Sequence, residues 1–246
     1  MIDPLVTEEQ QLTAEDPTLH LIRDKYHQLI QENDWNVAIC MPSHQGLVTV
    51  WTMRSLIGMY RPPGITLIPT GCFVDVLRNR AAKEIMNIPA ITHIFYIDSD
   101  IVVPFYALMR LLQRDKEVIC GLYYKRAPPF SPLIYQYQPE WAVPQLRPML
   151  SEWENRLIEI GGSGGGCLLV AKEVFFEADY PWFHINYTGQ HEEPDYLSED
   201  VQFFMKCHKA GYKTYMDTSV VCQHMNGTLA FPMQIGEGPA KIQEVQ

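Results

Sequence analysis

The sequence predicts an α/β fold: one Rossmann-like domain with a mostly parallel central sheet flanked by helices, and a small antiparallel extension near the C-terminus. Between residues 36 and 124, short apolar runs alternate with stretches whose apolar residues recur at helical spacing. Proline, glycine or acidic residues end these runs. This order is typical of a parallel sheet with right-handed crossovers, which binds ligands beyond the carboxyl ends of its strands.

Each strand of this region is expected to be short and buried, and a helix should follow each of the first three. The expected strands are NVAICMPS (36–43), GITLIPTG (64–71), THIFYIDSD (92–100) and EVICGLYY (117–124). The expected helices are GLVTVWTMRSLIGMY (46–60), DVLRNRAAKEIMN (75–87) and PFYALMRLLQRD (104–115).

The second half of the chain is less regular. Residues 128–155 are rich in proline and tryptophan and predict a long loop. After it we expect a glycine-rich loop followed by a helix (157–175), a polar loop (186–197), a helix (198–211) and a pair of strands (213–219 and 220–225). We interpret residues 1–35 as an extension with one helix, 36–226 as the main domain and 227–246 as a tail.

Composition limits the classes of function. The formal net charge of −10 argues against non-specific nucleic-acid binding, which needs Lys and Arg to neutralise phosphates. The six cysteines form no C-x-x-C pair, so we expect reduced thiols rather than a structural zinc site. No apolar run approaches the roughly 20 residues of a membrane span, and the N-terminus has no signal-like apolar region. We therefore expect a cytoplasmic protein without a membrane span.

Two carboxylates, Asp98 and Asp100, follow the apolar strand in FYIDSD (95–100). Clusters of oxygen ligands suit Mg²⁺ or Mn²⁺, which carboxylates and substrate phosphates hold together. The alternative is that the two residues cap the next helix, since acidic side chains favour helix N-termini. An isolated D-x-D triplet does not decide between the two.

Three further segments bear on that choice. GGSGGGC (161–167) lets the backbone approach a ligand closely, although no Lys-Ser/Thr follows it as in a P-loop. SED (198–200) begins a predicted helix, where its carboxylates either hold a proton-accepting position or cap the helix. His224 ends an apolar strand, and imidazole can bind Mn²⁺.

In this order, these segments resemble nucleotide-sugar glycosyltransferases of the GT-A fold, near the large inverting family-two group, and especially small stand-alone members carried by bacteriophages. The resemblance covers residues 36–226. It rests on FYIDSDIVVP, GGSGGGCLLVAKEVF, SEDVQFFMKCHKAGYKTYMD, VDVLRNRAAKE and His224. The chain departs from the usual pattern in having Met225 and Asn226 after the histidine, where glycine is more usual, and in its glycine-rich loop.

The resemblance implies a Mn²⁺- or Mg²⁺-dependent transfer, in the cytoplasm of the host if the gene is a phage gene. It implies that Asp98, Asp100 and His224 hold the metal. It implies Asp200 as the catalytic base, with Glu199 as the second choice. The expected nucleotide-binding residues are Pro42, Ser43, Asp75, Arg78, Asp98 and Ser99. The expected sugar or acceptor residues are Tyr124, Arg126, Gly164, Gly165, Gly166 and Trp182.

The implied partners are a nucleoside-diphosphate sugar, with UDP favoured, and an acceptor that is a glycan, a small molecule or a hydroxymethylated base in phage-type DNA. The loop 186–197 is a candidate lid. Transfer with retention, a nucleotidyltransferase that makes nucleotide sugars, and a non-catalytic binding module are the alternatives. The oligomeric state does not follow from the sequence.

Overall fold

The structure of the protein is a computed structural model that describes residues 17–126, 128, 130–136, 145–146, 155–187, 196–226 and 228–230. The chain forms two compact units, Met1–Trp35 and Asn36–Gln246. In the first unit, helix α1 spans Pro17–Glu32, close to the helix predicted there. All the other described elements belong to the second unit. No described helix has the length and apolar character that crossing a membrane requires.

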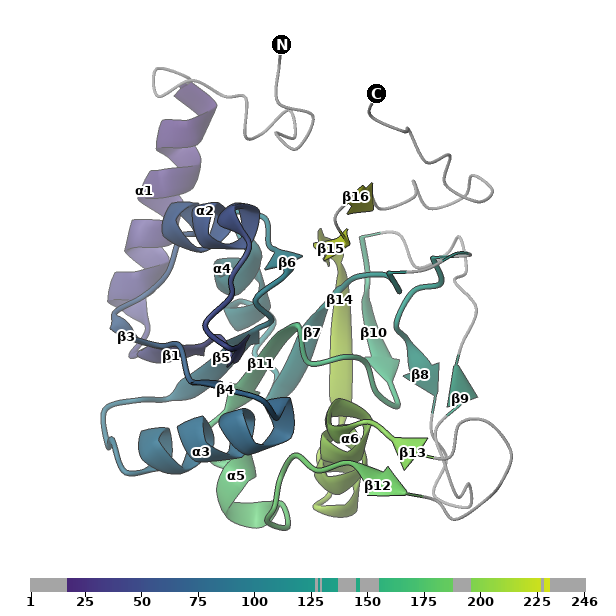
Figure 1. Ribbon diagram of the computed structural model, residues 1–246. Helices are drawn as coiled ribbons and strands as arrows, with labels where there is room; N and C mark the ends of the chain where they lie inside the picture. Colours follow the sequence, from purple (N-terminus) through teal and green to yellow (C-terminus); the bar gives the residue numbers. More distant parts are fainter. Residues whose placement is uncertain are drawn as a thin grey trace. The chain divides into compact units, whose positions relative to one another are not determined.

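A seven-stranded sheet with the order β10-β14-β7-β11-β5-β1-β3 forms the centre of the second unit (Figure 1). Its strands are β1 (Val37–Cys40), β3 (Gly64–Leu67), β5 (His93–Ile97), β7 (Val118–Leu122), β10 (Leu157–Ile160), β11 (Cys167–Ala171) and β14 (Thr214–Val221). Five strands point the same way, while β10 and β11 run antiparallel to their neighbours. The predicted α/β class with a mostly parallel sheet is confirmed.

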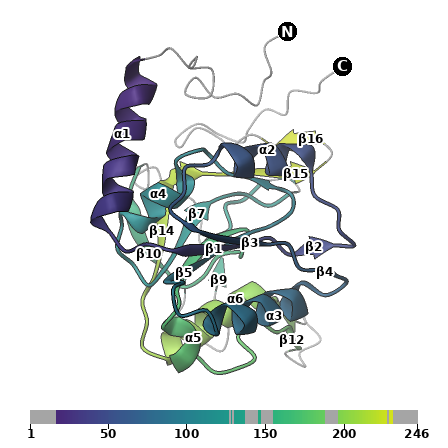
Figure 2. The same ribbon diagram turned by 90° about the vertical axis from the view of Figure 1, so that its left-hand side faces the viewer.

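Helices cover both faces of this sheet. Figure 2 shows α2 and α4 on one face and α3, α5 and α6 on the other. The helices are α2 (Val50–Gly58), α3 (Val74–Met86), α4 (Ala107–Leu112), α5 (Val174–Glu177) and α6 (Glu199–Lys209). Thr49 caps the N-terminus of α2, and its hydroxyl oxygen accepts a hydrogen bond from the backbone N–H of Thr52 at 3.0 Å.

Small sheets extend the domain. The predicted antiparallel extension near the C-terminus is the sheet β16-β15-β6, with β6 (Ile101–Val102), β15 (Gln223–Asn226) and β16 (Thr228–Ala230). The two-stranded pairs are β2 (Ser43–His44) with β4 (Thr70–Gly71), β8 (Tyr135–Gln136) with β9 (Gln145–Leu146), and β12 (Asn186–Tyr187) with β13 (Tyr196–Leu197). Strand β16 lies at the start of the segment predicted to be a tail, and residues 231–246 lie outside the described residues.

The hydrophobic core on the α3, α5 and α6 side of the sheet is rich in aromatic rings. Phe203 of α6 stacks on Phe183 and Phe175, with ring centroids 4.5 and 5.7 Å apart. The ring of Tyr96 from β5 meets that of Phe183 edge to face at 5.2 Å. All four side chains are buried. This packing anchors α6 against the sheet and so fixes where the first turn of α6 lies.

Two expectations for the second half of the chain are wrong in detail. The glycine-rich loop leads into strand β11, and only the short α5 follows, because the five residues CLLVA are all buried between β5 and β7. The break between the last two predicted strands lies at Cys222 rather than after Ser219, since β14 continues to Val221. A fully buried apolar run carries no periodicity that separates a strand from a helix.

A buried carboxylate ties the residues after α4 to β14. Asp217 has a fully buried side chain, and it accepts hydrogen bonds from Arg114 Nε at 2.6 Å and from the Ser219 hydroxyl at 2.5 Å. Burial raises the pKa of Asp217, but these hydrogen bonds outweigh it, and the pKa lies below the usual 3.8. The folded state therefore binds the proton less readily than the unfolded state.

We predict that this group makes the stability of the protein sensitive to acid. Its contribution should be complete above pH 3.8 and should disappear as the pH falls below that value towards the lowered pKa. Asp217→Asn should reduce the free energy of unfolding by about 2–4 kcal/mol at neutral pH, and the difference from wild type should shrink in acid. Urea unfolding of both proteins between pH 7 and pH 3 measures this. A difference that stays constant with pH would contradict the prediction.

Candidate functional site

A cavity of about 330 Å³ opens beyond the carboxyl ends of β1 and β5, against the first turn of α6. Its lining residues are Pro42, His44, Gly71, Cys72, Val74, Leu77, Arg78, Asp98, Ser99, Asp100, Arg126, Glu199 and Asp200. Segments more than a hundred residues apart in the sequence therefore meet at one place. This is the edge at which the alternating strands and helices predict a ligand site.

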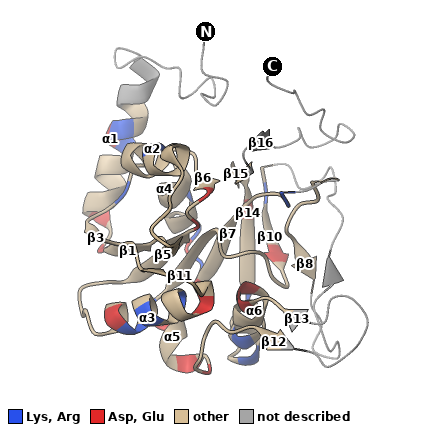
Figure 3. Cartoon of the chain, viewed as in Figure 1, with Lys and Arg blue, Asp and Glu red and all other residues tan. Residues whose placement is uncertain are grey.

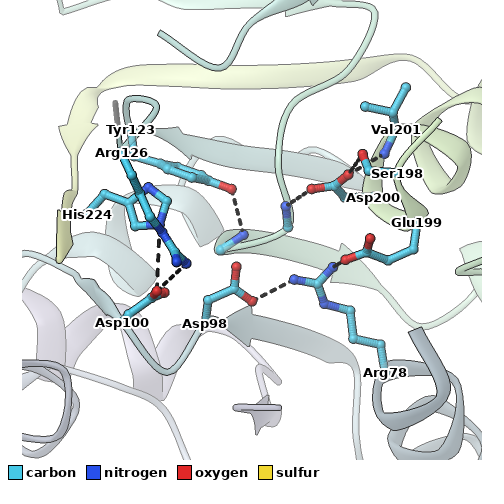
Figure 4. A network of polar contacts seen from close by, with 12 residues as sticks. Arg78, Asp98, Asp100, Tyr123, Arg126, Ser198, Glu199, Asp200, Val201 and His224 are labelled. Atoms are coloured by element: carbon cyan, nitrogen blue, oxygen red, sulfur yellow. Dashed lines mark hydrogen bonds and ion pairs between the residues drawn. The ribbon is translucent and has the colours of Figure 1, made fainter. Parts of the chain in front are cut away.

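Arg78 of α3 organises the acidic centre of the cavity. Its Nη2 donates to Asp98 Oδ1 at 2.6 Å and its Nη1 to Glu199 Oε1 at 2.8 Å (Figure 4). Only 1% of the Arg78 side chain is exposed, and its guanidinium lies 5.5 Å from the centroid of the Phe183 ring. Burial lowers the pKa of Arg78, but the charges of Asp98 and Glu199 outweigh this effect, so the pKa lies above its usual value and the guanidinium stays charged.

The adjacent carboxylates Glu199 and Asp200 begin helix α6 and have different hydrogen-bond partners. Burial and the neighbouring charge of Asp200 raise the pKa of Glu199, although Arg78 opposes this effect. Asp200 Oδ1 accepts hydrogen bonds from the Ser198 hydroxyl and from Val201 N, the latter at 2.8 Å. Figure 3 shows acidic residues at the start of α6 and basic residues at its end, the distribution that the helix dipole favours.

The glycine run 164–166 packs directly beneath these side chains. The backbone N–H of Gly165 donates to Asp200 Oδ2 at 3.2 Å, and that of Gly166 donates to the Tyr123 hydroxyl at 3.0 Å. A Cβ atom at Gly164 would lie 1.9 Å from the Tyr123 hydroxyl, and one at Gly165 would lie 2.7 Å from Arg78 Cζ. The glycines thus allow the chain's own site residues to approach the backbone, whereas the sequence predicted a close approach by a ligand.

We predict that Gly165→Ala reduces the free energy of unfolding by about 1–3 kcal/mol, because the new methyl group overpacks a guanidinium that two carboxylates hold in place. Gly58→Ala is the matched control, since no atom lies within 4 Å of the added Cβ, and it should be neutral or slightly stabilising. Chemical denaturation of the two variants measures the difference. Equal effects at both positions would contradict the packing argument.

Asp100 lines the other end of the cavity, directly before β6, and His224 lies next to it on β15 but is not among the lining residues. His224 of β15 pairs with Ile101 of β6, and the backbone N–H of Met225 donates to the carbonyl of Asp100 at 2.8 Å. Asp100 Oδ2 and His224 Nε2 are 3.8 Å apart. Burial raises the pKa of Asp100, and the charge of Arg126 opposes that rise.

Arg126 contacts both groups. Its Nη2 donates to Asp100 Oδ2, and its Nε donates to His224 Nε2 at 2.6 Å (Figure 4). The other ring nitrogen, His224 Nδ1, lies 2.9 Å from the carbonyl oxygen of Tyr124. Because a carbonyl only accepts, Nδ1 carries the ring proton and Nε2 presents its lone pair.

The three predicted metal ligands fit a divalent ion in part. Asp100 and His224 converge, and the hydrogen bond at Nδ1 holds the imidazole in the tautomer that a metal requires. Asp98 instead directs one oxygen to Arg78. Across the described ranges, no three His, Cys, Asp or Glu side chains are grouped so that they could hold a metal ion.

Some predicted residues lie apart from the cavity. The Ser43 side chain is buried, and its hydroxyl donates to the carbonyl of Leu47 at 2.8 Å. Asp75, in the first turn of α3, is not among the cavity-lining residues. Trp182 is buried in the core and donates to the carbonyl of Phe175, so the interpretation of its indole as an acceptor contact needs correction. Of the candidate lid, residues 188–195 lie outside the described residues.

The prediction for the tyrosine pair after β7 also needs correction. Tyr124, predicted to contact sugar, has a buried side chain in the core, and only its carbonyl reaches His224. Tyr123 faces the site instead, and its ring lies edge to face with His224 at 5.6 Å. Successive side chains of an extended segment point to opposite sides, which separates the two. The cavity residues His44, at the end of β2, and Cys72, directly after β4, were missed because neither belongs to a motif.

Comparison with solved structures supports the fold. The crystal structure of A197 from STIV has a TM-score of 0.54 and 19% identity, over 78% of this chain and 86% of that one. The crystal structure of GalNAc-T7 with UDP, GalNAc and Mn²⁺ has a TM-score of 0.50 and 12% identity. That match covers 79% of this chain and 44% of GalNAc-T7, so the chain spans less than half of that enzyme.

The fold is thus consistent with the GT-A type, as the sequence predicted. No protein-family model matches the sequence. No curated protein matches it at the level of sequence either.

Proposed function

We propose that this protein is a glycosyltransferase that moves a sugar from a nucleoside-diphosphate sugar to an acceptor hydroxyl with inversion. One observation carries the proposal. On a GT-A-like fold, strand-end carboxylates Asp98 and Asp100 and helix-start carboxylates Glu199 and Asp200 line the same cavity. Such a site has one acidic group for a cation near a diphosphate and another for proton transfer.

The donor that we propose is a UDP-sugar, used with Mn²⁺ or Mg²⁺. GalNAc-T7, a structural neighbour, was crystallised with UDP, GalNAc and Mn²⁺. Asp100 and His224 would hold the ion, which when bound neutralises charge on the leaving diphosphate. Pro42 and Ser99, both in the cavity lining, would border the nucleotide.

Asp200 is the proposed catalytic base. Hydrogen bonds from Gly165, Ser198 and Val201 fix its carboxylate, which lines the cavity. Its task is to accept the proton of the acceptor hydroxyl as that oxygen attacks the anomeric carbon. Glu199 is less suited, because its carboxylate is already paired with Arg78. Arg78 is a positioning residue that holds Asp98 and Glu199, and a direct contact with the diphosphate remains a prediction.

The acceptor that we propose is an uncharged hydroxyl of a glycan or small molecule. Four carboxylates and two arginines line the cavity, and the whole chain carries a net charge of −10. This balance opposes a polyanion such as DNA, whose binding depends on basic residues. A hydroxymethylated base in DNA remains the alternative acceptor that an assay should include.

The test is thermal denaturation with UDP-, GDP-, CDP- and TDP-sugars, with and without Mn²⁺, because a ligand of the native state raises the melting temperature. We expect a metal-dependent rise with one nucleotide family, which Asp100→Ala should abolish. Lys213→Ala, which removes an exposed ion pair with Glu159, is the control and should keep the rise. No rise with any donor would point to a non-catalytic binding module. A separate assay of the released product distinguishes a nucleotidyltransferase, which would release pyrophosphate instead of nucleoside diphosphate.

A further inference from the structure

The guanidinium of Arg126 bridges the two groups expected to hold the metal. It donates from separate nitrogens to Asp100 Oδ2 and to His224 Nε2, the latter at 2.6 Å (Figure 4). The acceptor atoms themselves are 3.8 Å apart. A cationic side chain of the protein is therefore bound by the same two atoms that a divalent ion would use.

His224 can bind either Arg126 or a metal ion, but not both at once. Nδ1 of His224 faces the carbonyl of Tyr124 and carries the proton, so Nε2 has a single lone pair to offer. That lone pair accepts the hydrogen bond from Arg126 Nε. It cannot accept a hydrogen bond and bind a metal at the same time. Arg126 must leave His224 before this nitrogen can become a metal ligand.

Asp100 and His224 are held rigidly, while the side chain of Arg126 can move. Backbone pairing between β6 and β15 fixes Asp100 relative to His224, and their side chains are 21% and 11% exposed. The Arg126 side chain is 53% exposed and lies beyond the end of β7. A long exposed side chain changes rotamer at small cost compared with two residues locked in a sheet.

We propose that Arg126 is a built-in competitor of the divalent ion, which occupies the metal position in the donor-free protein and leaves it when a diphosphate binds. The identity of the arriving ligand rests on the proposed function, but the competition itself does not. Phosphate oxygens accept two parallel hydrogen bonds from a guanidinium, so a diphosphate offers Arg126 a new partner. Metal and nucleotide would then bind cooperatively, because each favours the state without the Arg126 bridge.

The test measures Mn²⁺ binding to the nucleotide-free protein. Electron paramagnetic resonance detects the binding as a loss of the signal of the free ion. Arg126→Gln should bind Mn²⁺ about 10-fold more tightly than wild type, within the usual range of coupling between sites. Arg80→Gln removes the same charge from an exposed position, 71% exposed and paired with Glu84, and should not change the affinity. Adding Asp100→Asn to Arg126→Gln should cancel the gain.

UDP is the probe for coupling. It should tighten Mn²⁺ binding by wild type more than by Arg126→Gln, because the variant has no bridge to release. Equal Mn²⁺ affinity in wild type and Arg126→Gln, including undetectable binding by both, would overturn the proposal. A gain that survives Asp100→Asn would overturn it too, since the ion would then bind elsewhere. If Arg126→Gln gains affinity but UDP has no effect on wild type, the competition stands and the proposed nucleotide donor is wrong.

Discussion

Asp200→Asn should slow sugar transfer by orders of magnitude while leaving donor binding intact. Asparagine keeps the shape of the side chain, and its one carbonyl oxygen can still accept the hydrogen bond from Val201 N, while its amide nitrogen replaces the oxygen that accepts from Gly165 N. It cannot accept the proton of the acceptor hydroxyl. Since a general base contributes about 10²- to 10⁴-fold to the rate, kcat should fall by that factor with little change in the KM for the donor.

Glu199→Gln is the matched comparison for this experiment. It changes the adjacent carboxylate by the same single group but weakens an ion pair with Arg78, so its main effect should be on stability. Steady-state transfer rates and donor affinities of both variants, corrected for the folded fraction, separate the two roles. Transfer by Asp200→Asn at the wild-type rate would show that this residue is not the base.

The largest effect on stability is expected for Arg78→Met. The substitution leaves Asp98 and Glu199 without their common cation, and the arginine that it removes is 1% exposed. Breaking a buried ion pair from one side costs about 3–5 kcal/mol, because the remaining charges stay in a poorly solvated place. We therefore expect the free energy of unfolding to fall by about that amount, with the cavity losing its acidic geometry.

Arg80→Met, two residues further along the same helix, controls for the loss of a positive charge and for helix propensity. Its side chain is exposed and its pair with Glu84 lies on the surface, so the change should stay within about 0.5 kcal/mol. Urea unfolding followed by circular dichroism compares the two. Arg78→Lys covers the case in which Arg78→Met does not fold, and it should lie between wild type and Met. Equal urea midpoints for the Arg78 and Arg80 variants would show that Arg78 does not organise the site.

The sequence predicts the framework of the site because local signals specify it. Apolar runs that stop at Pro42 or Asp98 define strand ends, and Ser198 followed by two acidic residues marks a helix start. In a parallel sheet these ends meet at one edge, so several cavity-lining residues follow from the pattern alone. The ion pairs of Arg78 do not, because its partners lie 20 and 121 residues away and no local rule orients the side chain inward.

The remaining errors have similar causes. Strand β11 was not distinguished from a helix because all of its residues are buried and hydrophobic. Trp182 precedes a polar loop and therefore resembles a ligand contact, but the core beneath α5 accommodates the indole. Arg126 was expected at the sugar, and its bridge between Asp100 and His224 depends on how β15 returns beside β6. A single sequence does not predict such long-range strand pairing.

The position of β11 also has a consequence for how the protein folds. This strand comes late in the chain, yet it separates β5 from β7 in the middle of the sheet. Until β11 leaves the ribosome, β5 lacks one neighbour and β7 lacks both, because β14 comes later still. Their open edges favour aggregation. The sheet closes only when β11 inserts between them, and the same step brings the glycine run beneath Arg78. Folding should therefore be slow and dominated by non-local pairing, and the domain should not divide into two halves that fold independently.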